Sequence, residues 1–227
     1  MNLKPEILKA IKRSGFEEAT PIQEKTIPLV LEGKDVIGQA QTGTGKTAAF
    51  GLPILQSLDK QHDSIQAIVI EPTRELAIQT QEELFRLGRD EKARVQVVYG
   101  GADIRRQIRA LKQTPAILVG TPGRLLDHLK RGTIDISKVK TIVLDEADEM
   151  LDMGFIQDIE SILNYASSKH QTLLFSATMP KPILRIGEKF MHDPEIVKIK
   201  GKELTANLID QYFVRAKENE KFDILCR

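Results

Sequence analysis

The chain has 227 residues, of which 41% are apolar and 29% charged, and 33 basic residues against 32 acidic ones leave a net charge of +1. This composition indicates a globular protein with one substantial core. The near-neutral charge excludes a strong overall attraction to nucleic acid or membranes, so a nucleic-acid site must be a local patch. The single cysteine, Cys226, excludes an internal disulfide, and no apolar run reaches membrane-spanning length. We therefore expect a cytoplasmic protein without membrane contact.

Two helices are predicted at the start of the chain. Residues 5–13 place apolar side chains on one helical face, and the proline at position 5 suits a first helical turn. A second helix should begin at Pro21, after a candidate N-cap threonine, and run to Leu31. The apolar stretch 35–38 then predicts a short buried strand, which leads into a glycine-rich segment.

From residue 67 onward, predicted strands and helices alternate. Apolar runs predict strands at 67–70, 95–99, 116–119, 141–144, 172–175 and 196–199. The segments between these strands are predicted as helices that end near residues 88, 112, 131, 166 and 191. Continuously apolar strands that alternate with helices predict an α/β fold, with a mostly parallel, twisted sheet covered by helices on both faces. Because ligands of such folds bind beyond the carboxyl ends of the strands, the polar clusters that follow the strands should converge there.

The apolar pattern lapses in residues 201–207, which we interpret as a linker. Residues 208–214 are predicted as a further strand, and residues 217–227 as the start of a helix that the chain does not complete. We expect residues 1–200 to form one domain, and residues 201–227 to be a linker and the beginning of a second one.

The strongest motif is a phosphate-binding loop between the strand at 35–38 and the helix that follows. It consists of Ala40, Gln41, Thr42, Gly43, Thr44, Gly45, Lys46 and Thr47. Gly43 and Gly45 let the backbone N–H groups point at phosphate oxygens. Lys46 can reach the β- and γ-phosphates of a nucleotide, and the Thr47 hydroxyl can ligate Mg²⁺. Ala40 replaces the usual opening glycine, and the alternative is a chance glycine turn before a helix.

A second cluster follows the predicted strand at 141–144. Asp145 can hold Mg²⁺ there, and Glu146 can orient or deprotonate an attacking water. The alternative is an N-cap with acidic residues in the first helical turn, which the upstream phosphate loop makes the less favoured interpretation. Ser176 and Thr178 end another strand, where they can hydrogen-bond to Asp148 and transmit the nucleotide state; Ser176 is equally suited to cap the next helix.

Further candidates are less specific. The amide of Gln23 matches the donor and acceptor on one edge of adenine, and Phe16 could pack on its ring, with a helix-surface glutamine and a core phenylalanine as the alternatives. Arg74 and Arg124 lie in turns that suit nucleic-acid phosphates, or alternatively ordinary capped helices. With few aromatic residues, backbone contact is favoured over base stacking. The histidines at positions 62, 128, 170 and 192 show no metal-ligand spacing and are interpreted as surface residues.

These motifs, in this order, resemble the first RecA-like domain of DEAD-box RNA helicases from about Leu3 to Lys200, and most closely the bacterial cold-shock branch. Residues 145–148 read Asp-Glu-Ala-Asp, the sequence whose one-letter code gives the family its name. An alanine at the position of Ala40 is normal in this family. The resemblance implies that Phe16 and Gln23 recognise adenine, that residues 40–47 and Asp148 belong to the ATP site, and that Lys46, Asp145, Glu146, Ser176 and Thr178 serve catalysis with Mg²⁺. It also implies RNA-backbone contacts by Pro72, Thr73, Arg74, Gly100, Gly101, Thr121, Pro122, Gly123 and Arg124.

The same resemblance implies a second RecA-like domain that completes both the ATP site and the RNA site. Family members also carry a phenylalanine upstream of Leu3 that stacks on adenine. We therefore expect this chain to bind nucleotide but to hydrolyse it poorly. Alternatives are another P-loop ATPase, such as a DNA translocase or transporter motor, and a non-catalytic RNA clamp; a GTPase is disfavoured because the Asn-Lys-x-Asp signature does not occur. Ribosome assembly, translation initiation and mRNA turnover remain open as pathways.

Overall fold

A computed structural model describes residues 3–61, 63–167, 169–199 and 221–225. Its centre is a seven-stranded sheet with the strand order β3-β4-β2-β5-β6-β1-β7, and every pairing among these strands is parallel. The strands are β1 (Val36–Gln39), β2 (Ala67–Ile70), β3 (Val95–Val98), β4 (Ile117–Gly120), β5 (Thr141–Leu144), β6 (Gln171–Ser176) and β7 (Glu195–Lys198). The predicted α/β fold with a parallel sheet is confirmed.

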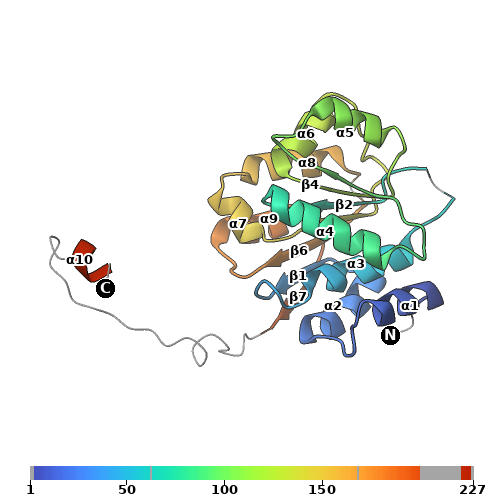
Figure 1. The fold of residues 1–227 in the computed structure, drawn as a ribbon, viewed down its shortest axis with the longest axis horizontal. Helices are drawn as coiled ribbons and strands as arrows, with labels where there is room; N and C mark the ends of the chain where they lie inside the picture. Colours follow the sequence, from blue (N-terminus) through green and yellow to red (C-terminus); the bar gives the residue numbers. More distant parts are fainter. Residues whose placement is uncertain (1–2, 62, 168, 200–220, 226–227) are drawn as a thin grey trace.

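Helices cover both faces of this sheet (Figure 1). One face packs against α1 (Pro5–Arg13), α2 (Pro21–Leu31), α3 (Lys46–Ser57) and α4 (Arg74–Leu87). The other packs against α5 (Ile104–Leu111), α6 (Pro122–Lys130), α7 (Ala147–Asp152), α8 (Ile156–Tyr165) and α9 (Lys181–Phe190). Successive side chains of a strand point to opposite faces, so Val69 joins the first core and its neighbours Ile68 and Ile70 join the second. Continuously apolar strands follow from this two-sided burial.

The first two helices begin and end where the sequence predicts, and each opens with a proline in its first turn. The prediction was incomplete after β5, where it placed a single helix from about residue 155. The structure has the additional six-residue helix α7, which begins directly after Glu146.

At the end of the chain, α10 (Lys221–Leu225) falls within the predicted helix at 217–227. The predicted linker at 201–207 and strand at 208–214 lie outside the described residues. Within the parts of the chain that the structure describes, no helix is both long and apolar enough to cross a membrane.

Candidate functional site

The strand order brings the predicted nucleotide motifs to one edge of the sheet. The phosphate loop leaves the carboxyl end of β1, and the acidic pair Asp145-Glu146 leaves that of β5. Strand β6 lies between these two strands and is hydrogen-bonded to both. The backbone N–H of Ala40 also donates to the carbonyl of Ser176 at 3.1 Å, which fixes where the phosphate loop departs from the sheet.

The phosphate loop has the backbone conformation that its glycines permit. Gly43 and Gly45 have φ angles of 82° and 88°, values that favour glycine because it has no Cβ. Helix α3 begins at Lys46, within the last two residues of the loop, so its first N–H groups face the same side as the loop. The Thr44 hydroxyl donates to the carbonyl of Gln41 at 2.7 Å and closes the turn. This cradle fits the phosphate oxygens of a nucleotide.

Lys46 lies between the two acidic residues that follow β5. Its Nζ atom is 2.8 Å from Oε1 of Glu146 and 3.5 Å from Oδ1 of Asp145, and all three side chains are buried. Burial by itself would lower the pKa of Lys46, but the two carboxylates outweigh it and raise the pKa. Despite these ion pairs, the Lys46 Nζ atom makes no hydrogen bond of good geometry. A buried ammonium with unused donors under a glycine turn is what a phosphate-binding lysine requires.

The acidic pair is itself constrained. Glu146 caps α7 with a φ of 49°, a left-handed conformation that is uncommon for residues other than glycine. Its Oε1 atom accepts from the Thr42 hydroxyl at 2.7 Å, while its backbone N–H donates to Oδ1 of Asp145 at 2.9 Å. Burial raises the pKa of Asp145 from 3.8 to about 6, although Lys46 works in the opposite direction. Two carboxyl groups thus face one ammonium, and burial disfavours the charged form of Asp145.

A cavity of about 240 Å³ joins these residues, and two carboxylates that the sequence analysis did not assign also line it. Glu71 is 1% exposed and accepts from the Thr80 hydroxyl at 2.6 Å. Burial, followed by the charge of Asp145, raises the pKa of Glu71 well above its ordinary value. Burial also raises the pKa of Glu83, against the effects of Arg86 and the Thr47 hydroxyl. Glu71 comes directly after β2, just as Asp145 comes directly after β5. This shared position could have identified Glu71 as a site residue from the sequence.

The residues predicted to hold Mg²⁺, Thr47 and Asp145, both line this cavity. Among the described residues there is no group of three or more His, Cys, Asp or Glu side chains that could hold a metal ion. Mg²⁺ usually takes only one or two protein carboxylates and completes its shell with phosphate oxygens and water. The hydroxyl and carboxylate present here fit that mode of binding.

Gln23 connects the phosphate loop to α2. Its Oε1 atom accepts from the backbone N–H of Thr20 at 3.0 Å, and its Nε2 atom donates to the carbonyl of Gly45 at 3.1 Å. Gln23 is 5% exposed, so the alternative of a helix-surface glutamine is wrong. It also lines a second cavity, largely apolar, together with Phe16, which packs against the core and is only partly buried. One donor and one lone pair of the amide remain for a base beside Phe16.

Asp148, Ser176 and Thr178 form a hydrogen-bonded network at the end of β6. The backbone N–H of Asp148 donates to the Ser176 hydroxyl at 3.2 Å, and the backbone N–H and hydroxyl of Thr178 each donate to Oδ2 of Asp148 at 2.8 Å. Burial works to raise the pKa of Asp148, but these hydrogen bonds outweigh it and hold the pKa below its ordinary value. The contacts that the sequence analysis expected between these residues are present.

The turns predicted to contact RNA follow three neighbouring strands, β3, β4 and β2. Gly100, Gly101 and Gly123 are exposed, and the Arg74 guanidinium lies 4.7 Å from the centre of the Tyr99 ring. The remaining members of the predicted set, Pro72, Thr73, Thr121 and Pro122, are buried or half-buried at the starts of α4 and α6.

The guanidinium of Arg124 is already hydrogen-bonded within the protein, which the sequence did not suggest. Its Nη1 and Nη2 atoms donate to the carbonyl of Ala102 at 3.1 and 3.2 Å, and Nη1 also donates to Oε1 of Gln107 at 2.9 Å. The interpretation of His128 as a surface residue was wrong, since it is fully buried beside the same glutamine. Of the other histidines, His192 is exposed, His170 is half-buried, and His62 lies outside the described residues.

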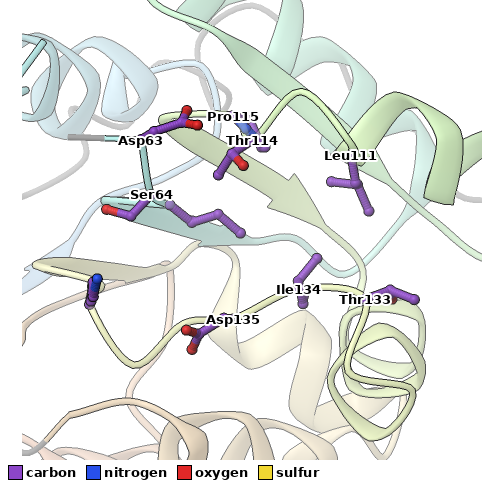
Figure 2. A pocket seen from close by; sticks show the side chains of 10 residues that line it. Asp63, Ser64, Leu111, Thr114, Pro115, Thr133, Ile134 and Asp135 are labelled. Atoms are coloured by element: carbon purple, nitrogen blue, oxygen red, sulfur yellow. The ribbon is translucent and has the colours of Figure 1, made fainter. Parts of the chain in front are cut away.

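A further cavity of about 200 Å³ lies among the segments before β2 and β4 and after α6, hence toward the amino ends of the strands (Figure 2). Its lining includes Asp63, Ser64, Thr114, Thr133 and Asp135. Among the described residues around it, none belongs to the predicted nucleotide or RNA sites.

A phosphate loop beside an acidic pair, at the carboxyl edge of a parallel sheet, defines a nucleotide-binding domain of the RecA-like class. A model of the DEAD/DEAH box helicase family matches residues 20–186, and the chain belongs to this family. The resemblance predicted from the motifs is thereby confirmed.

Relatives agree with this assignment. The chain is 70% identical over all 227 residues to the ATP-dependent RNA helicase CshA of Limosilactobacillus reuteri, of which it covers 46%. It is 63% identical over 226 residues to the DEAD-box ATP-dependent RNA helicase CshA of Bacillus subtilis (strain 168), again covering all of this chain and 46% of the relative. The chain thus spans about half the length of the curated relatives it matches.

Solved structures agree as well. A DEAD box protein from the hyperthermophile Methanococcus jannaschii matches with a TM-score of 0.85 and 47% identity, over all of this chain and 61% of that one. A hypothetical ATP-dependent RNA helicase from Sulfolobus tokodaii matches with a TM-score of 0.80 and 41% identity, over 88% of this chain and 57% of that one.

Proposed function

We propose that this chain is the ATP-binding half of an ATP-dependent RNA helicase, which binds ATP with Mg²⁺ and the RNA backbone. The observation that carries the proposal is the buried Lys46 ammonium, held 2.8 Å from Glu146 beneath a glycine turn. The names of the relatives, ATP-dependent RNA helicases, support the choice of RNA over DNA. The single cysteine and an RNA substrate are both compatible with the cytoplasm, where we place this activity.

In this proposal each buried group has a separate task. Lys46 releases its carboxylate partners and binds the phosphate oxygens, while Gln23 and Phe16 hold the adenine. Thr47 and Asp145 hold Mg²⁺, which, when bound, neutralises charge that develops on the phosphates. Glu146 orients the attacking water or takes its proton. Asp148, Ser176 and Thr178 link this site to the end of β6 and so to neighbouring segments.

The RNA backbone is bound by the turns after β2, β3 and β4. Exposed glycines, the first N–H groups of α4 and α6, and nearby guanidinium groups suit phosphate oxygens. We propose that a second RecA-like domain completes both sites, because the relatives are about twice as long as this chain. A missing arginine from such a domain typically lowers phosphoryl-transfer rates by about 10³–10⁵-fold. We expect poor ATP turnover by the chain alone.

The test is ATP hydrolysis by this chain with and without single-stranded RNA, with Glu146→Gln as the control and single-stranded DNA for comparison. Measurable adenine-nucleotide and RNA binding with little turnover is expected. Strong turnover stimulated equally by DNA would favour another P-loop motor. Strong turnover specific to RNA and abolished by Glu146→Gln would contradict the need for a second domain.

A further inference from the structure

The side chain of Gln107, in α5, is the centre of a polar network behind the predicted RNA face. It is 9% exposed, and its Nε2 atom donates to the backbone carbonyl of Tyr99 at 3.0 Å. Its Oε1 atom accepts from Nη1 of Arg124 at 2.9 Å and lies 3.1 Å from Nε2 of His128. A single amide thus contacts residues that belong to, or adjoin, two different turns.

These contacts fix the orientation of every group in the network. A backbone carbonyl and a guanidinium leave the amide one arrangement, with its NH₂ group on Tyr99 and its oxygen on Arg124. His128 must then carry a proton on Nε2 in order to donate to the same oxygen. Burial, followed by the charge of Arg124, lowers the pKa of His128 and keeps the ring neutral. Its Nδ1 atom is then an acceptor 2.7 Å from the Thr133 hydroxyl, whose one proton is shared between Nδ1 and the backbone carbonyl of His128 at 3.0 Å.

The network reaches all three segments proposed to bind RNA. Tyr99 directly precedes the two exposed glycines after β3, and its ring lies under the guanidinium of Arg74 at the start of α4. Arg124, in the first turn of α6, donates both to Gln107 and to the carbonyl of Ala102 just after the glycines. The turn after β3 is therefore held at both ends, by Gln107 through Tyr99 and by Arg124 through Ala102.

We propose that Gln107 is a positioning residue for RNA binding, which holds the three backbone-binding segments in register without touching the RNA itself. The proposal rests on the proposed function, because it presumes that these turns bind RNA phosphates. His128 supports Gln107 from the interior by supplying the Nε2–H donor. A multi-point phosphate site depends on such support, since small displacements of any one segment weaken every contact made by the others.

The central variant is Gln107→Met, which keeps the length and approximate volume of the side chain and removes both hydrogen-bonding ends. Single-stranded RNA affinity of this chain is measured by fluorescence anisotropy over a range of salt concentrations, together with binding of a fluorescent adenine nucleotide. We expect RNA affinity to fall about tenfold, which corresponds to the net contribution of one or two ordinary hydrogen bonds. The slope of the logarithm of RNA affinity against the logarithm of salt concentration should become shallower by about 0.7 for each phosphate that the variant no longer neutralises. Nucleotide affinity should change less than twofold.

Two further comparisons separate positioning from general damage. Gln113→Met, on an exposed glutamine just beyond α5, should bind RNA like the wild type. His128→Phe removes the donor to Gln107, whereas His128→Gln retains an amide donor near the same place. The first should reproduce the effect of Gln107→Met, and the second should restore much of the RNA affinity.

The outcomes are distinguishable. Wild-type chain that does not bind RNA would overturn the proposed function and this inference with it. RNA binding by the wild type, with affinity and salt slope unchanged in folded Gln107→Met, would overturn the inference alone. A parallel loss of RNA affinity, nucleotide affinity and thermal stability, not restored by His128→Gln, would also overturn it, because it would make the network a general stabiliser of the fold.

Discussion

The Nζ atom of Lys46 lies 2.8 Å from Oε1 of Glu146, and the two residues come from opposite sides of strand β6. Each is the other's counter-charge as long as no phosphate is present. The ion pair keeps both side chains buried without an uncompensated charge, which would otherwise be costly. A bound phosphate would compete with both carboxylates for the ammonium, whose donors make no hydrogen bond here.

Lys46→Met tests this relationship. The variant leaves Asp145 and Glu146 without a positive partner, so we expect the free energy of unfolding to fall by about 3–5 kcal/mol. Nucleotide affinity should fall at least tenfold, because the phosphate loses its charged donor. Chemical denaturation and binding of a fluorescent ADP analogue measure the two effects. Lys34→Met, which affects only exposed ion pairs with Glu195 and Glu32, should change neither. Unchanged nucleotide binding by Lys46→Met would contradict the role of the loop.

The raised pKa of Asp145 predicts a pH-dependent stability. Its pKa is about 6 in the folded chain against 3.8 ordinarily, so the folded state binds this proton more tightly than the unfolded state. Ionised Asp145 therefore costs stability above pH 6, and the cost is relieved as the pH falls from about 6 toward 4. Relative to Asp145→Asn, the wild type should gain at most about 3 kcal/mol over this range. Urea denaturation of both proteins between pH 7 and 4.5 measures the difference; parallel curves would show that the carboxyl titrates normally.

Gln23→Ala should reduce the preference for adenine. The variant loses the amide that faces the Phe16 cavity and also the hydrogen bond to the Gly45 carbonyl. We expect discrimination between ATP and GTP to fall by at least about fivefold, the lower end of what a good amide–base pair contributes. Competition of each nucleotide against labelled ADP measures this. Equal loss of both affinities would mean that Gln23 only supports the loop.

Thr178→Ala should remove the coupling between nucleotide binding and RNA affinity. It removes the hydroxyl that donates to Asp148, while the backbone N–H of Thr178 still reaches the same carboxylate oxygen. Because Thr178 is exposed, the stability should change by less than about 1 kcal/mol. RNA affinity measured with and without a non-hydrolysable ATP analogue should lose its dependence on nucleotide. If that dependence persists at its full size, the network after β6 does not transmit the nucleotide state.

The sequence predicted best what depends on contiguous residues. The phosphate loop and the acidic pair are short patterns whose chemistry follows from neighbouring residues alone. The starts of α1 and α2 are marked by prolines. Helix α7 was missed because it is only six residues long and directly follows Glu146, whose left-handed conformation interrupts the helical periodicity. Local rules do not anticipate a conformation that tertiary contacts impose.

The supporting residues of the site were not predictable in this way. Gln107 and His128 have no distinguishing neighbours in sequence, and they acquire a role only when α5 and α6 place them side by side. Histidine in general is intermediate between buried and exposed residues, so its side-chain type alone does not indicate burial. Glu71 was the exception, because its position directly after a buried strand repeats that of Asp145.

Gly45 has a consequence for how such sequences can diverge. A Cβ atom built on it would lie 2.5 Å from Nε2 of Gln23, and its φ of 88° already disfavours any side chain. The glycine is thus favoured first by its backbone conformation, and the amide of Gln23 would also have to shift to make room for a side chain. A side chain at position 45 is therefore expected to arise only together with a change in the backbone of the loop and a displacement of the amide at position 23.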